Sequence, residues 1–211
     1  MKRIYFVRHG ESEGNVGPLR QTSTSTLTEK GKEQAAFVAE RSAKLEFEVL
    51  ISSTMNRAKE TAEIVGTKTG KAIEYSDLFV ERRRPSEMLG KRKDDPIGLH
   101  VEKEIIENFT QSGWRFSDEE NFDDLKKRAL AALQYLADRP EETMLVVTHG
   151  FFMRIVMASV VFGDTLQAEE CEAFIRTFSM ENTGITVLEY SEGKKVNPWE
   201  LIVWNDHAHL G

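Results

Sequence analysis

Cysteine and long apolar runs are scarce in this sequence. Its 211 residues include one cysteine, Cys171, so no disulfide bond can form within the chain. No stretch of about 18 consecutive apolar residues is present, and we therefore expect no membrane-spanning helix. The first residues also lack the apolar core that a secretory signal peptide needs. Because a single cysteine suits a reducing compartment, the sequence predicts a cytoplasmic protein that does not associate with membranes.

An excess of positive charge is also missing. The formal net charge is −7, from 28 lysines and arginines against 35 aspartates and glutamates. Nucleic acids need a basic face on their partner, so we expect no nucleic-acid ligand. A small anionic substrate is repelled at long range, and a phosphate site would need a local cluster of positive charge. With 211 residues, of which 40% are hydrophobic, the chain is long enough for one globular domain over residues 1–211.

Residues 4–7 form a continuous apolar run that ends abruptly in polar residues. The run is β-branched and aromatic, which predicts a buried strand, and Arg8, His9 and Gly10 follow it directly. Open α/β sheets bind their ligands at the carboxyl ends of strands. An arginine can grip phosphoryl oxygens and a neutral imidazole can attack phosphorus. The alternative is an ordinary strand end with a surface Arg and His, and the tripeptide alone does not decide between them.

Two later stretches repeat this arrangement. Residues 144–148 predict another buried strand, which ends in His149 and Gly150 before a helix begins. Residues 49–51 predict a strand whose following helix carries Arg57 in its first turn, beside free backbone N–H groups. A solvated helix arginine is the alternative for Arg57. Because parallel strands present their carboxyl ends at one edge, we expect both imidazoles and both guanidiniums to meet there.

The remaining pattern alternates between strands and helices. It predicts an α/β fold, a three-layer sandwich with a parallel-dominated central sheet and helices on both faces. The expected helices begin at Thr28, at Ser53 or Thr54, near Val101, after a capping box of Ser117 with Glu120, and after Gly150. Later strands are predicted at residues 174–180, 183–189 and 201–204, and one ending at Val80.

Residues 77–117 interrupt the alternation and predict a helical insertion over the active site, which would act as a substrate cap. Six cations lie between Arg82 and Lys93, followed by two aspartates. They could bind a second anionic group of a substrate. Equally, they could form a solvated surface strip balanced by nearby carboxylates, since exposed pairs contribute little.

The order of the motifs resembles the histidine phosphatase superfamily, the phosphoglycerate-mutase-like fold. Residues 8–15 are similar to its opening signature, and further matches follow in the family's order up to Leu210. These matches are Leu27-Thr28 with Gly31 and Gln34-Ala35, Ser52-Ser53 with Arg57-Ala58 and Thr61-Ala62, Thr148-His149-Gly150, Asn182-Thr183-Gly184, and Trp204-Asn205-Asp206 with Ala208-His209-Leu210. Each motif is short, but their order and spacing together are specific.

The chemistry assigns His9 as the covalent nucleophile. Its second ring nitrogen would have to donate to a partner, most simply a backbone carbonyl, so that the first stays unprotonated. Arg8, Arg57, His149 and Gly150 would surround the phosphoryl oxygens, and His149 would also take part in catalysis. We expect no cofactor and no metal, and we interpret His207 and His209 as structural.

For three of the candidate site assignments the sequence leaves an alternative open. The resemblance implies an acidic proton donor after the third strand, for which Glu81 fits best and Glu87 is second. Asn15 could donate its amide to the phosphoryl group, or it could simply form a turn. Glu11 and Glu13 are interpreted as loop carboxylates, although Glu11 could line the pocket.

We interpret the chain as a phosphomonoester hydrolase that acts on a small phosphorylated metabolite. Gly14 stands where cofactor-dependent mutases of the family usually have Trp, and Ser25 and Thr26 stand where many members have Asp. Phosphoglycerate mutase-type transfer and a catalytically silent phospho-ligand binding protein are the alternatives. The sequence indicates neither the oligomeric state nor the natural substrate.

Overall fold

The computed structural model describes residues 1–194 and 196–211. Across these residues the chain forms a six-stranded sheet in the order β3-β2-β4-β1-β5-β6. The strands β3, β2, β4 and β1 are parallel, while β5 runs antiparallel to β1 and to β6. The strand bounds are β1 Lys2–Arg8, β2 Val49–Ser52, β3 Ile73–Tyr75, β4 Thr143–Thr148, β5 Ile185–Tyr190 and β6 Trp199–Asp206. The predicted α/β class with a mainly parallel sheet is confirmed.

The described part of the chain also contains seven α-helices. Their bounds are α1 Glu13–Val16, α2 Glu29–Ser42, α3 Asn56–Thr69, α4 Pro96–Glu107, α5 Phe122–Asp138, α6 Gly150–Phe162 and α7 Ala168–Thr177. Thr28 caps α2 as expected, because its side chain accepts the N–H of Gly31. Within the described ranges, no helix has the length and apolar character that crossing a membrane requires.

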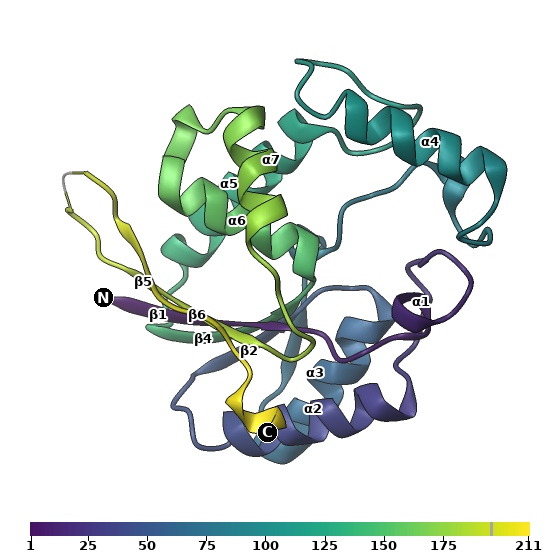
Figure 1. Ribbon diagram of the computed structural model, residues 1–211. Helices are drawn as coiled ribbons and strands as arrows, with labels where there is room; N and C mark the ends of the chain where they lie inside the picture. Colours follow the sequence, from purple (N-terminus) through teal and green to yellow (C-terminus); the bar gives the residue numbers. More distant parts are fainter. Residues whose placement is uncertain (195) are drawn as a thin grey trace.

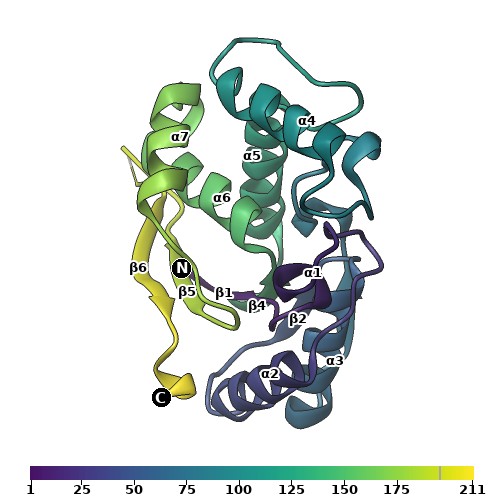
Figure 2. The same ribbon diagram turned by 45° about the vertical axis from the view of Figure 1, so that its right-hand side comes forward.

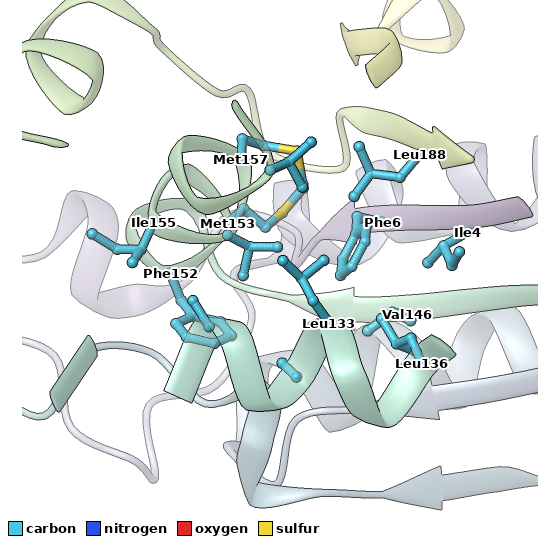
Figure 3. Packing of buried hydrophobic residues seen from close by; sticks show 14 of the residues in the cluster. Ile4, Phe6, Leu133, Leu136, Val146, Phe152, Met153, Ile155, Met157 and Leu188 are labelled. Atoms are coloured by element: carbon cyan, nitrogen blue, oxygen red, sulfur yellow. The ribbon is translucent and has the colours of Figure 1, made fainter. Parts of the chain in front are cut away.

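The strand β1 is buried on both faces, which its continuous apolar run predicts. Ile4 and Phe6 point into a core built with α5 and α6, and Figure 3 shows this packing around Leu133, Leu136 and Phe152. Tyr5 and Val7 alternate with them and point into a second core with α2 and α3. Helix pairs therefore cover opposite faces of the sheet, as Figures 1 and 2 show.

The prediction of a strand at residues 174–180 is wrong. Most of this segment belongs to α7, which begins with a capping box between Gln167 and Glu170. Its aromatic residues lie at helical spacing, and Phe174 and Phe178 both pack against Trp204 of β6. An apolar run of this length does not distinguish a strand from a helix, and contact with β6 decides it.

Three boundaries also differ from their predictions. The helix α5 is capped by Asn121 rather than by a Ser117–Glu120 box, since Ser117 has a φ of 52° and Asn121 accepts the N–H of Asp124. The helix α3 starts after Met55 as N-cap, not after Ser53 or Thr54. Leu78 and Phe79 lie in a short 3₁₀ helix, η1 Asp77–Phe79, beyond the end of β3. The ends of helices are the least certain part of a sequence-based assignment, and the shift at α3 is one or two residues.

Residues 77–117 do leave the alternating pattern, and they contain η1, η2 Ser86–Met88 and α4. A small separate core of Met88, Val101 and Ile105 holds this segment together. Figure 1 shows α4 beyond the carboxyl end of β1, on the same side of the molecule as α1. The segment is tied to the chain after α1 through backbone bonds from Arg20 to Lys91 and from Lys93 to Pro18.

Candidate active site

The structure brings His9, Arg57 and His149 together at the carboxyl edge of the parallel strands. His9 follows β1, Arg57 lies in the first turn of α3, and His149 is the N-cap residue of α6. The centroids of the two imidazole rings are 5.0 Å apart, with 58° between the ring planes. Both rings are buried, as is the guanidinium of Arg57. The order of the strands in the sequence predicts that these side chains lie together at this edge of the sheet.

The hydrogen bonds of His9 fix its tautomer. Its Nδ1 lies 2.7 Å from the carbonyl oxygen of Gly10, which can only accept, so Nδ1 carries the proton. Its Nε2 accepts the Nε–H of Arg57 across 3.1 Å. Burial, and then the charges of Arg57 and Arg8, hold the pKa of His9 well below its usual value. At neutral pH the ring is therefore uncharged, with a lone pair on Nε2.

A close backbone approach explains the glycine after His9. A Cβ on Gly10 would lie 2.3 Å from the carbonyl oxygen of Gly31, in the first turn of α2. Backbone atoms cannot yield as a flexible side chain would, so a larger residue would displace the turn that carries His9. The glycine thus allows α2 to pack directly against the nucleophile loop.

His149 has one satisfied nitrogen and one without a partner. Its Nε2 lies 2.8 Å from Oγ of Ser53, while Nδ1 is buried and makes no hydrogen bond within the described structure. Burial, followed by the charges of Arg57 and His9, lowers the pKa of His149 well below its usual value. Ser53 was predicted only as a helix cap, so its contact with His149 is new information from the structure.

Arg8 and Arg57 supply positive charge that no carboxylate neutralises. Arg57 donates to the carbonyl oxygen of Thr22 at 3.1 Å, and Arg8 donates to that of Met180. In the described part of the chain, neither guanidinium forms an ion pair. Burial lowers the pKa of Arg57 to about 10, which still leaves it charged at neutral pH. Arg57 is buried and Arg8 is half-buried, and two such cations without a paired carboxylate favour a site that receives an anion.

Gly150 lets Arg8 approach the start of α6. A Cβ at Gly150 would lie 3.0 Å from Nε of Arg8, and that nitrogen is buried without a hydrogen-bond partner. The guanidinium of Arg8 and the backbone at the beginning of α6 are therefore neighbours. A helix N-terminus with free N–H groups adds to the local positive potential.

Glu81 is anchored at this same helix end. Its carboxylate accepts the N–H groups of Phe151 at 3.2 Å and Phe152 at 2.9 Å. The helix dipole stabilises a carboxylate in this position. Glu87 instead lies exposed in the insertion, 3.4 Å from the hydroxyl of its neighbour Ser86. Of the two candidate proton donors, the structure places Glu81 next to the residues that follow His149.

The side chain of Asn15 forms a turn. Its Oδ1 accepts from the backbone N–H and the hydroxyl of Ser12, both at 3.0 Å, across the short helix α1. This geometry is the turn alternative that the sequence left open. Its amide nitrogen makes no hydrogen bond within the described residues, which leaves a donor for a ligand.

The basic run of the insertion is largely occupied by contacts within the chain. Arg82 is buried and pairs with Glu119 at 2.7 Å, which favours the structural reading of this cation. The others are less buried: Arg83 donates to Asp118, Arg92 to Asp94 and Lys93 to the carbonyl of Asn15, while Arg84 lies 3.9 Å from Glu102. A second anionic group of a substrate would have to compete with these partners.

His209, near the end of the chain, contacts Thr183 and Arg41 rather than His9 or His149. Nε2 of His209 lies 3.1 Å from the hydroxyl of Thr183, and its Nδ1 lies 3.3 Å from Arg41. Over the described residues, no group of three or more histidine, cysteine or acidic side chains is placed to hold a metal ion. Asn182, the neighbour of Thr183, donates to the carbonyl of His9 at 2.9 Å, a contact that the sequence motif did not reveal.

Two imidazoles and two guanidiniums meet at the carboxyl edge of the parallel strands, which defines an α/β protein with a locally basic site. The sequence agrees with this class, because residues 4–207 match the histidine phosphatase superfamily (branch 1). The chain belongs to this superfamily.

Its relatives include both mutases and phosphatases by name. The chain is 31% identical over 215 residues to a probable phosphoglycerate mutase GpmB from Salmonella arizonae, covering 100% of this chain and 95% of the relative. It is similar in structure to YhfR from Bacillus stearothermophilus, with a TM-score of 0.83, 30% identity and full coverage of both chains. A mycobacterial glucosyl-3-phosphoglycerate phosphatase has the same fold, with a TM-score of 0.78, 23% identity and coverage of 97% and 99%.

Proposed function

We propose that this protein is a phosphomonoester hydrolase that acts through a phosphohistidine on His9. The observation that carries the proposal is the uncharged, buried His9, whose Nε2 lone pair faces the guanidinium of Arg57. A nucleophile must be unprotonated, and a phosphoryl group needs its charge neutralised at the same place. The arrangement of Arg57 and His9 meets both needs.

The reaction follows from the positions of these groups. Nε2 of His9 attacks phosphorus, the bond to the ester oxygen breaks, and a phosphohistidine forms. Arg8, Arg57, His149 and the backbone at Gly150 neutralise the non-bridging oxygens. Water then attacks phosphorus, the P–N bond breaks, and inorganic phosphate leaves. Preorganised donors of this kind lower the barrier because they need no rearrangement during the reaction.

We assign the proton transfers to Glu81. The leaving oxygen takes a proton from its carboxylic acid in the first step, and the carboxylate takes a proton from the attacking water in the second. Its hydrogen bonds to Phe151 and Phe152 hold the carboxyl group beside the phosphoryl site. The first step needs the carboxylic acid of Glu81 and leaves its carboxylate, which the second step converts back to the acid.

The segment of residues 77–117 is proposed as the substrate cap. Two observations support this: the segment makes backbone bonds to the residues after α1, and α4 lies on the same side of the molecule as α1. Because most of its cations already have partners, we expect it to recognise a substrate through shape and apolar contact more than through a second anion. The substrate is proposed to be a small phosphorylated metabolite.

Phosphoglycerate mutase activity is the second candidate. The 31% identity to a probable phosphoglycerate mutase GpmB favours it. A mutase must protect its phosphohistidine from water and return the phosphoryl group, and it needs a bisphosphorylated activator. Turnover of phosphoglycerate that depends on a trace of bisphosphoglycerate would establish this activity instead.

The direct test combines p-nitrophenyl phosphate hydrolysis with rapid-quench labelling of His9. We expect hydrolysis by the wild type and an acid-labile phosphate on His9 during turnover. His9→Ala should lower kcat by on the order of 10⁴-fold or more. His207→Ala changes an exposed histidine outside the proposed cap and should leave kcat unchanged. Full activity of His9→Ala would refute the assignment, and tight phosphate binding without any turnover would indicate a silent binding protein.

A further inference from the structure

Ser53 makes a contact with His149 that the catalytic scheme above does not use. The serine follows β2 directly, and its backbone N–H donates to the carbonyl of Val147 at 3.0 Å. Its side chain is fully buried and lies 2.8 Å from Nε2 of His149. Neighbouring strands β2 and β4 therefore fix the distance between this hydroxyl and the imidazole.

The hydrogen bonds that the Ser53 hydroxyl can form indicate which ring nitrogen of His149 carries the proton. A serine hydroxyl has one proton to donate and two lone pairs to accept with. One lone pair of Ser53 is taken by the backbone N–H of Met55 at 3.2 Å. In the described structure, the acceptor within reach of its proton is Nε2 of His149. Donation in this direction makes Nε2 the unprotonated nitrogen of a neutral ring.

The other direction of this bond is less favourable. If Nε2 of His149 carried the proton, the hydroxyl proton of Ser53 would be buried without an acceptor, at a cost of about 1–3 kcal/mol. Nδ1 would then carry a lone pair, which would repel the oxygens of an anion bound beside it. With the proton on Nδ1, the unpartnered nitrogen of His149 becomes a free donor, on a ring whose centroid lies 5.0 Å from that of His9.

We propose that Ser53 is a positioning residue, whose hydroxyl donates to Nε2 of His149 and fixes the ring as the Nδ1–H tautomer. Nδ1–H then donates to a non-bridging phosphoryl oxygen. Both histidines of the site are then Nδ1–H tautomers, but His9 donates from Nδ1 to the Gly10 carbonyl, whereas His149 accepts at Nε2 from the Ser53 hydroxyl. This inference rests on the proposed function only in naming a phosphoryl group as the ligand.

The tautomer can be measured without any turnover. In protein labelled with ¹⁵N on histidine, long-range ¹H–¹⁵N correlation distinguishes a protonated from an unprotonated ring nitrogen. We expect Nδ1 of His149 to be protonated in the ligand-free wild type. Ser53→Ala should move the ring toward Nε2–H or a mixture of tautomers. Ser52→Ala is the matched control, because Ser52 is equally buried but its hydroxyl donates to the carbonyl of Ser53. A wild-type ring protonated on Nε2 would overturn the proposal.

Binding of inorganic phosphate tests whether this tautomer of His149 contributes to recognition of the anion. Ser53→Ala should weaken phosphate binding about tenfold, and Ser53→Thr, which keeps a hydroxyl, should restore most of it. In a His149→Gln background, Ser53→Ala should have no further effect, since the serine acts through the histidine. An equal loss in both backgrounds would refute the positioning role. If phosphate binds and the tautomer is as expected but no ester is hydrolysed, the hydrolase proposal fails while this inference stands.

Discussion

Arg57 donates its Nε–H to Nε2 of His9, so the guanidinium occupies the lone pair of the proposed nucleophile before any ligand is present. The distance is 3.1 Å, and both groups are buried. A cation in this position opposes protonation of the ring, which keeps the nitrogen available. In the proposed mechanism, this N–H turns from the ring to a phosphoryl oxygen when the substrate enters, which frees the lone pair of Nε2. In that mechanism the Arg57–His9 pair links activation of the nucleophile to recognition of the anion.

The two neutral histidines predict an unusual pH dependence of stability. In the unfolded chain both would titrate near pH 6.5, whereas burial keeps the pKa values of His9 and His149 well below that in the folded protein. As the pH falls below about 6.5, the unfolded state binds protons that the folded state does not, so the free energy of unfolding decreases. Each histidine contributes up to about 1.4 kcal/mol per pH unit.

Urea unfolding in phosphate-free buffer at about pH 7.5 and about pH 5.5 measures this dependence. Replacing His9 by Asn should reduce the loss of stability between the two conditions. His100→Asn, which changes an exposed histidine, should leave the loss as it is in the wild type. An unchanged pH dependence in the His9 variant would show that His9 titrates alike in the folded and the unfolded protein, which would contradict a lowered pKa.

Glu81→Gln should impair hydrolysis of alkyl phosphates much more than that of aryl phosphates. A phenolate leaves without a proton, so an aryl ester does not need the acid in the first step. We expect kcat for an alkyl ester to fall about 10²-fold or more, since general acid catalysis contributes about that much. Glu87→Gln is the control, because Glu87 lies exposed in the insertion. If only the Glu87 variant shows the difference between ester types, Glu87 is the proton donor.

Asn182→Ala should lower kcat because the Asn182 side chain forms a hydrogen bond with the backbone of His9, the proposed nucleophile. Its amide donates to the carbonyl of His9 at 2.9 Å, and the next residue, Thr183, donates to the carbonyl of Arg8. Loss of this bond should cost about 1 kcal/mol of stability and about tenfold in kcat through displacement of the ring.

Asn108→Ala provides the comparison. Asn108 makes the same type of bond, from its amide to the carbonyl of Glu104, at 2.8 Å near the end of α4. It should lose a similar amount of stability in thermal unfolding without a tenfold change in kcat. Equal kcat values for the two variants would remove Asn182 from the set of positioning residues.

Glu119→Gln should destabilise the fold by about 3 kcal/mol, because it leaves the charge of Arg82 buried without its partner. The side chains of this pair are 6% and 1% exposed, and the guanidinium of Arg82 also lies over the ring of Phe151. Asp94→Asn breaks the exposed pair with Arg92 and should cost less than about 1 kcal/mol. Chemical denaturation of both variants measures the difference, and equal losses would contradict a structural role for Arg82.

Local sequence patterns predicted the elements whose burial follows from a short run of apolar residues. The strand before His9, the strand before His149 and the helix that carries Arg57 were all correct in type. A continuous β-branched run can be buried only between two helical layers, so the sheet class followed as well. The neighbourhood of the two histidines then followed from strand direction alone, because parallel strands end at one edge.

Secondary structure and side-chain contacts that depend on residues elsewhere in the chain could not be predicted from local patterns. Residues 174–180 carry an aromatic run that fits a strand, and packing against Trp204 makes most of it helical. Glu120 looked like part of a capping box, yet it forms an ion pair with Arg128 eight residues later. Arg82 belonged to a basic run that fitted either a substrate contact or a solvated surface strip, and the structure buries it against Glu119.

The sequence by itself determined the family, the mainly parallel sheet and the presence of two histidines and two arginines at its edge. Only the tertiary structure decided how each of these groups is held: His9 by Gly10 and Arg57, His149 by Ser53, and Glu81 by the start of α6. The reason is physical. Burial follows from the apolar pattern of a short segment, whereas a tautomer, a pKa or an ion pair depends on atoms that arrive from strands and helices far away in the chain.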